Sequence, residues 1–111
     1  MTIAETNTID IIATRPDSDV VKLVIADHLE WSDLDTHARL LQEKINTYIE
    51  FVESGQLGRL EGHRVPPSPQ VWISLATQHE PTTEAKELLA RIGRFLEGCG
   101  LRFEIDSRYV E

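Results

Sequence analysis

The central third of the chain carries a long apolar stripe with helical spacing, and this stripe constrains the fold more than any other feature. Within residues 34–54 apolar side chains recur at steps of three and four residues, which places them on one side of an α-helix. Ser32, Asp33 or Asp35 can cap the start of this helix, and Gly55 suits its end. The stripe consists of Leu34, Ala38, Leu41, Ile45, Tyr48, Ile49 and Val52. A helix with one apolar side needs a second layer to cover it.

The rest of the chain predicts one more helix and four strands. A second helix is expected over residues 83–97, with Thr82 or Thr83 as its cap and Gly98 or Gly100 at its end. Its apolar stripe consists of Ala85, Leu88, Leu89, Ile92, Phe95, Leu96 and Cys99. Segments with alternating or β-branched apolar residues predict strands at residues 9–14, 20–27, 71–78 and 101–106.

The order of these elements predicts a two-layer α/β fold of the α+β type, β-β-α-β-α-β. The short turn after residue 14 makes the first two strands an antiparallel hairpin, and right-handed crossovers carry the chain to the later strands. Crossovers that advance in the same direction place both helices on one face of a four-stranded mixed sheet. Residues 1–111 are expected to form a single domain, with residues 1–8 as a flexible N-terminus.

Residues 55–70 are a long connection with three glycines and three prolines, which predicts a loop. Long loops in small domains are either functional or mobile. We expect this loop either to act as a lid over a site or to pack against the domain.

The net charge of −8 argues against nucleic acid and against anionic membranes as partners, because both need clustered Lys and Arg. Much of the acid lies between residues 27 and 53, a segment that contains seven carboxylates and only two basic residues. Two interpretations remain open for this segment: a solvated helix surface, or a docking surface for a basic protein partner. The candidate interaction residues of this segment are the acids Asp33, Asp35, Glu43 and Glu50.

A cytoplasmic location is expected from three features. Cys99 is the one cysteine, so an intrachain disulfide cannot form. The first residues lack the basic start and apolar run of a signal peptide. No apolar stretch approaches the ~20 residues that span a bilayer.

The segment after the second predicted strand is rich in potential metal ligands, yet its spacing argues against a metal site. His28 and His37 are nine residues apart and fall on different elements, and no second cysteine assists them. Asp33 and Asp35 lack the glycine and the closing Glu of a calcium loop. We therefore predict helix caps and solvated turn residues here, and no metal.

The weak catalytic candidates are His79 and Glu80, at the end of the third predicted strand, where α/β folds often bind ligands. A zinc hydrolase would need a second His where Thr83 stands. Cys99 is expected to be a buried thiol and not a nucleophile. No phosphate-binding glycine loop and no nucleophile elbow is present, so no cofactor is predicted.

The first predicted helix resembles that of a family of small uncharacterised bacterial proteins, known as a domain of unknown function. In that family an acidic segment leads into a helix with a Q-x-K-x-N-x-Y pattern that ends near S-G. The corresponding residues here are Gln42, Lys44, Asn46, Tyr48, Ser54 and Gly55. The resemblance extends from the first hairpin through the second helix and implies a shared fold, without an activity. We expect Gln42 and Asn46 to hold the loop of residues 55–70 or to bond a partner.

These observations favour a non-enzymatic protein-interaction module that forms a homodimer. The expected contact patch is Trp72, Ser74 and Ala76, on the face of the sheet that the helices leave open. An immunity-like or antitoxin-like role, neutralising a basic protein, is one version of this hypothesis and rests on analogy. The alternative is a small-molecule binder or enzyme that uses His79, Glu80 and the loop of residues 55–70.

Overall fold

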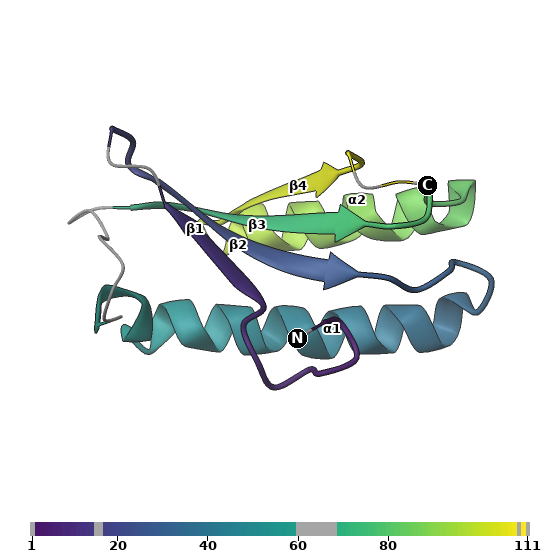
Figure 1. The fold of residues 1–111 in the computed structure, drawn as a ribbon, viewed down its shortest axis with the longest axis horizontal. Coiled ribbons are helices and arrows are strands. Elements are labelled where there is room, and N and C mark those ends of the chain that lie inside the picture. Colours follow the sequence, from purple (N-terminus) through teal and green to yellow (C-terminus); the bar gives the residue numbers. More distant parts are fainter. Residues whose placement is uncertain (1, 15–16, 60–68, 109, 111) are drawn as a thin grey trace.

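A four-stranded mixed sheet and two helices form two layers, in the predicted order β-β-α-β-α-β (Figure 1). The structure is a computed structural model, and it describes residues 2–14, 17–59, 69–108 and 110. Its elements are β1 (Ile11–Thr14), β2 (Val20–Asp27), α1 (Leu34–Glu53), the short 3₁₀ helix η1 (Gln56–Arg59), β3 (Gln70–Thr77), α2 (Thr83–Gly98) and β4 (Arg102–Asp106).

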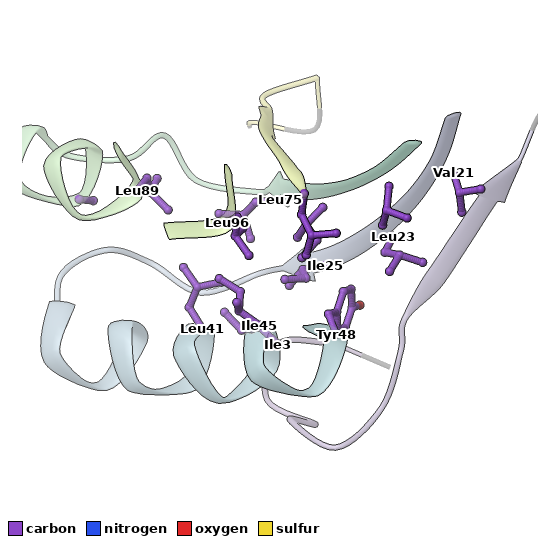
Figure 2. Packing of buried hydrophobic residues seen from close by; sticks show 14 of the residues in the cluster. Ile3, Val21, Leu23, Ile25, Leu41, Ile45, Tyr48, Leu75, Leu89 and Leu96 are labelled. Atoms are coloured by element: carbon purple, nitrogen blue, oxygen red, sulfur yellow. The ribbon is translucent and has the colours of Figure 1, made fainter. Parts of the chain in front are cut away.

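The strands lie in the order β1-β2-β3-β4. β1 pairs with β2 antiparallel, whereas β2 with β3 and β3 with β4 are parallel pairs. Both crossovers therefore advance in the same direction, and both helices cover the same face of the sheet, as predicted. Figure 2 shows the result: Leu41 of α1 and Leu89 of α2 point into one cluster with Leu23 of β2 and Leu75 of β3.

The caps of both helices confirm the sequence prediction. The Asp33 side chain accepts a hydrogen bond from the Thr36 amide at 3.2 Å, and Thr82 accepts one from the Ala85 amide at 3.2 Å. The Thr36 hydrogen bonds lower the pKa of Asp33 below its usual range. After α1 the chain turns at Gly55 with φ of 80°, a conformation that favours glycine.

The buried stripe of α2 is narrower than predicted. Phe95 is 57% exposed and Cys99 is also exposed, so the expectation that both are buried is wrong. Leu88 and Ile92 are only half-buried. The reason is position: α2 lies over the β3 and β4 side of the sheet, where the sheet ends, and only a narrow part of the helix meets the core.

The N-terminal segment packs against α1 through a fully buried lysine. The Lys44 ammonium donates to the backbone carbonyls of Glu5 and Thr8, each at 2.7 Å, and to Asp10 Oδ1 at 2.6 Å. The charge of Lys44 is thus balanced by one buried carboxylate and satisfied by carbonyl oxygens. We predicted a flexible N-terminus at residues 1–8, and the structure places residues 2–8 along this helix.

Tyr48, one turn further along α1, makes the second connection. Its hydroxyl donates to the Val24 carbonyl at 2.7 Å and accepts from the Asp10 amide at 3.0 Å. Burial raises the pKa of Tyr48 above its usual range. Ile3 is fully buried, and its amide donates to the Ala26 carbonyl at the edge of β2. The Lys and Tyr of the helix pattern therefore anchor the N-terminal segment.

Candidate functional site

The face of the sheet opposite the helices is the candidate functional site. Within the described residues no helix or strand lies over this face. The strand register places its side chains in rows that cross β2, β3 and β4. The rows are Lys22, Trp72 and Arg102; Val24, Ser74 and Glu104; and Ala26, Ala76 and Asp106.

This open face is hollowed, with a cavity volume of about 980 Å³. Small side chains line much of the hollow, among them Ala13, Val24, Ala26 and Ala76. Ile11 of β1, which is 52% exposed, also lines it. An exposed isoleucine beside a hollow of small side chains leaves apolar surface available for contact.

Trp72 is half-buried in this face, and an ion pair lies beside it. Lys22 Nζ lies 2.7 Å from Glu104 Oε1 and 5.8 Å from the centroid of the Trp72 ring. Because Lys22 belongs to β2 and Glu104 to β4, the pair crosses over β3. Ser74, a predicted contact residue that is paired in register with Glu104, is only 3% exposed. Within the described residues the Trp72 indole nitrogen is buried and has no hydrogen-bond partner.

A second pair of opposite charges lies at the C-terminal end of β4. Arg108 Nη2 lies 2.7 Å from Asp106 Oδ2, and the hydrogen bond from Arg108 lowers the pKa of Asp106 below its usual range. The open face therefore carries both signs of charge, arranged mainly in neutral pairs. This balance differs from the excess acid of the whole chain.

The acids predicted to form an interaction surface lie away from this face. Asp33, Asp35, Glu43 and Glu50 are all exposed, and all four belong to α1 or its cap. The structure therefore does not bring them together with Trp72 and Ala76. The chain has two separate candidate surfaces, one on each layer.

The strand-end candidates, His79 and Glu80, do not line the hollow. His79 is half-buried and Glu80 is exposed. The His79 backbone carbonyl accepts a hydrogen bond from the Trp31 indole at 3.0 Å, which is a structural contact. The predicted lid over them is the loop of residues 55–70, of which residues 60–68 lie outside the described part of the chain.

A buried histidine–aspartate pair is the feature that sequence reasoning missed. His37 Nε2 lies 2.6 Å from Asp27 Oδ2, and His37 Nδ1 donates to the Glu30 carbonyl at 3.0 Å. The Trp31 ring stacks on the imidazole, with the centroids 3.7 Å apart. Since a carbonyl oxygen only accepts, Nδ1 carries a proton, and the short contact between Nε2 and Oδ2 joins the ring to the carboxylate.

The prediction that Asp27 and His37 are solvated turn residues is therefore wrong. His37 is 1% exposed and Asp27 is 2% exposed, so both side chains are closed off from solvent. The pair joins the end of β2 to the first turn of α1. The signal in the sequence was an acid at the end of a buried strand, with a histidine placed where the first helical turn faces it.

Within the part of the chain that the structure describes, no group of three or more His, Cys, Asp or Glu side chains is placed to hold a metal ion. Two ligands, as in the Asp27 and His37 pair, are fewer than the three protein ligands that even an open zinc site uses. Absence of a metal stays a prediction. A thermal-shift assay with zinc tests it, because a bound metal raises the melting temperature.

The fold and its open face define a small two-layer α+β protein in which no described helix or strand covers the hollowed face of the sheet. The chain belongs to a family of unknown function, DUF6572, whose family model matches residues 1–108. A search of curated proteins and a search of solved structures found no match. None of the helices among the described residues is long and apolar enough to cross a membrane.

Proposed function

We propose that this chain is a protein-interaction module that forms a homodimer through the open face of its sheet. The observation that carries the proposal is the hollow of about 980 Å³ across that face, bordered by the exposed Ile11 and the half-buried Trp72. Apolar surface beside small side chains is what a packed interface needs, because a large side chain of one chain fills the hollow of the other.

A second copy of the chain is the occupant that the charges favour. A two-fold interface uses the same patch from both subunits, so the patch must tolerate itself. The open face does so, because Lys22 is paired with Glu104 and Arg108 with Asp106. A strongly acidic or strongly basic face would repel its copy, and this face is neither.

Small-molecule binding is the second candidate function, and the size of the hollow favours it. Ligand sites range from about 300 to 1,000 Å³. This candidate differs from the site expected at His79, because the hollow lies over the middle of the sheet. A chain that stays monomeric and gains thermal stability from small molecules would favour it over the dimer.

Sedimentation equilibrium at micromolar concentration tests the homodimer. We expect the wild type to dimerise and Ile11→Glu to weaken the dimer at least about tenfold, because a charge would enter an apolar contact. Ile11 is exposed, so the variant keeps the core intact. The matched control is Phe95→Glu, because Phe95 is a similarly exposed apolar residue of the helix layer. A monomeric wild type, or Ile11→Glu that dimerises as strongly as Phe95→Glu, overturns the proposal.

The proposal includes a cytoplasmic site of action and a bacterial source. The lone Cys99 supports the first, because a reducing compartment suits a chain without disulfides. The resemblance of the α1 pattern to small bacterial proteins supports the second.

A further inference from the structure

The helix layer carries a second hollow, separate from the open face of the sheet. It has a volume of about 550 Å³ and lies between the last turns of α1 and α2. Its lining includes Ile49, Glu50 and Glu53 of α1 and Phe95 of α2. It also includes Ser54 and Cys99, the C-cap residues of the two helices. We call it the C-terminal groove.

Phe95 gives the groove an apolar anchor point. Among the described residues it is the most exposed large hydrophobic side chain, at 57%. Ile49, on the facing helix, is half-buried and packs against the core. Two apolar side chains from different helices thus border one groove, which fits an apolar side chain of a partner.

The lining of the groove includes two acidic residues and no basic one, since Arg91 and Arg94 of α2 are not among its lining residues. Glu50 and Glu53 are exposed, and neither forms an ion pair within the described residues. The nearest preceding base in α1 is Lys44, which is buried and already paired with Asp10. The carboxylates of the groove are therefore available to an outside cation.

The helix ends add to the same potential. α1 and α2 run parallel to each other, since each connects two parallel strands (Figure 1). Their C-cap residues, Ser54 and Cys99, both line the groove. A helix C-terminus carries about half a negative charge, which basic side chains of the last turn often offset. Neither α1 nor α2 has a basic residue in its last turn. Two independent features, the carboxylates and the helix ends, thus favour a cationic partner.

We propose that the C-terminal groove binds a basic polypeptide segment of a partner protein, with an apolar residue over Phe95 and Ile49 and flanking Lys or Arg side chains at Glu50 and Glu53. The partner is a polypeptide because the groove combines an apolar anchor with acid, and nucleic acid or an anionic membrane would be repelled. This inference goes beyond the homodimer, since it uses the opposite layer of the molecule.

The probe is a fluorescent peptide composed only of Leu and Lys, titrated into the full chain and followed by fluorescence anisotropy. We expect Phe95→Ala to weaken binding about tenfold, as an anchor residue should. The double variant Glu50→Gln with Glu53→Gln should weaken binding at low salt by a similar factor. The matched control is Glu84→Gln with Glu87→Gln, which removes the same charge from the start of α2.

Cys99 locates the bound peptide, because it is exposed, lines the groove and is the one cysteine of the chain. Bound peptide should slow the alkylation of Cys99 by a bulky maleimide, and a peptide of Lys alone should not. The Ile11→Glu chain should bind the peptide as the wild type does, which separates this inference from the homodimer. Absent binding, equal losses in the Glu50 and Glu84 double variants, or unchanged Cys99 alkylation would each overturn the proposal.

Discussion

The two layers of this protein present surfaces built on opposite principles. The open sheet face places Lys22 against Glu104 and Asp106 against Arg108, so most of its charges are paired beside a hollow of small side chains. The C-terminal groove leaves Glu50 uncompensated beside an exposed Phe95. A surface with balanced charges accepts its own copy, whereas an acidic one repels its copy and attracts a basic protein. The net charge of the whole chain therefore predicts the charge of neither surface.

The largest expected effect comes from breaking the buried ion pair between Lys44 and Asp10, which lies outside both surfaces. Asp10→Ala leaves the Lys44 ammonium buried with its carboxylate partner removed, and stranding a buried charge typically costs about 3–5 kcal/mol. The free energy of unfolding, from urea titration, should fall by that amount. If both surfaces require the intact fold, the dimer and peptide binding should weaken together as the unfolded fraction rises.

The control for this change is Asp19→Ala, which removes a carboxylate from the turn between β1 and β2. It should change the unfolding free energy by less than about 0.5 kcal/mol, as surface substitutions usually do. Equal losses in Asp10→Ala and Asp19→Ala would contradict a special role for the Lys44 pair.

A somewhat smaller loss is expected from the core between the two surfaces, and it distinguishes the helices. Ile45 of α1 is 3% exposed, whereas Leu88 of α2 is half-buried. Emptying a core site costs about 2–5 kcal/mol, so Ile45→Ala should lie in this range and Leu88→Ala below it. Chemical denaturation measures both. A greater loss at Leu88 would mean that α2 packs more tightly than its exposure indicates.

The local sequence pattern predicts the secondary structure and layers of this protein well, because strands and helices each have a characteristic spacing of apolar residues. The caps Asp33 and Thr82, both helices and the open face followed from such patterns. The two buried polar pairs did not, since Lys44 and Asp10 are far apart along the chain, and a lysine that will be buried looks like a solvated one. Exposure of Phe95 depends on where the sheet ends, which helical spacing alone does not encode.

Substitutions confined to one surface should weaken binding at that surface and leave binding at the other unchanged. Trp72→Glu should weaken the dimer at least about tenfold, while the peptide of Leu and Lys still binds. Phe95→Glu should weaken peptide binding and leave the dimer unchanged. Sedimentation equilibrium and anisotropy on the same samples measure both properties. Since Trp72 is half-buried, circular dichroism must first show that Trp72→Glu is folded. A folded Trp72→Glu that loses peptide binding would mean that the two surfaces are coupled.

Salt should separate the two surfaces without any substitution. Peptide binding at the groove relies on exposed carboxylates, whose attraction falls as the Debye length shortens from ~10 Å at 0.1 M salt to ~3 Å at 1 M. The dimer relies on apolar contact and paired charges, so its affinity should change less. We expect raising the salt to weaken the peptide complex clearly more than the dimer. A dimer with the steeper salt dependence would reverse the assignment of the surfaces.

The smallest expected effect is the acid dependence of stability at one carboxylate on each layer. Asp33 caps α1 and Asp106 accepts hydrogen bonds from Arg108, and both have a pKa lowered below the usual value of 3.8. A carboxyl group whose pKa is lower in the folded state binds protons more readily when unfolded. Its stabilising contribution is therefore present above pH 3.8 and is lost as the pH falls through the lowered folded value.

Asparagine replacements isolate these two contributions. Asn also caps helices well, so Asp33→Asn should keep the α1 cap while flattening the loss of stability below pH 3.8. Asp106→Asn should flatten it in the same pH range by weakening the bond to Arg108. Urea titrations between neutral pH and pH 2.5, with Asp35→Asn as the control of equal charge, measure the slopes. Asp33 and Asp106 have different surroundings, but in both a hydrogen bond to the carboxylate lowers the pKa. Both substitutions should therefore change the slope of stability against pH in the same direction. An Asp35→Asn chain that flattens the slope equally would contradict this cause.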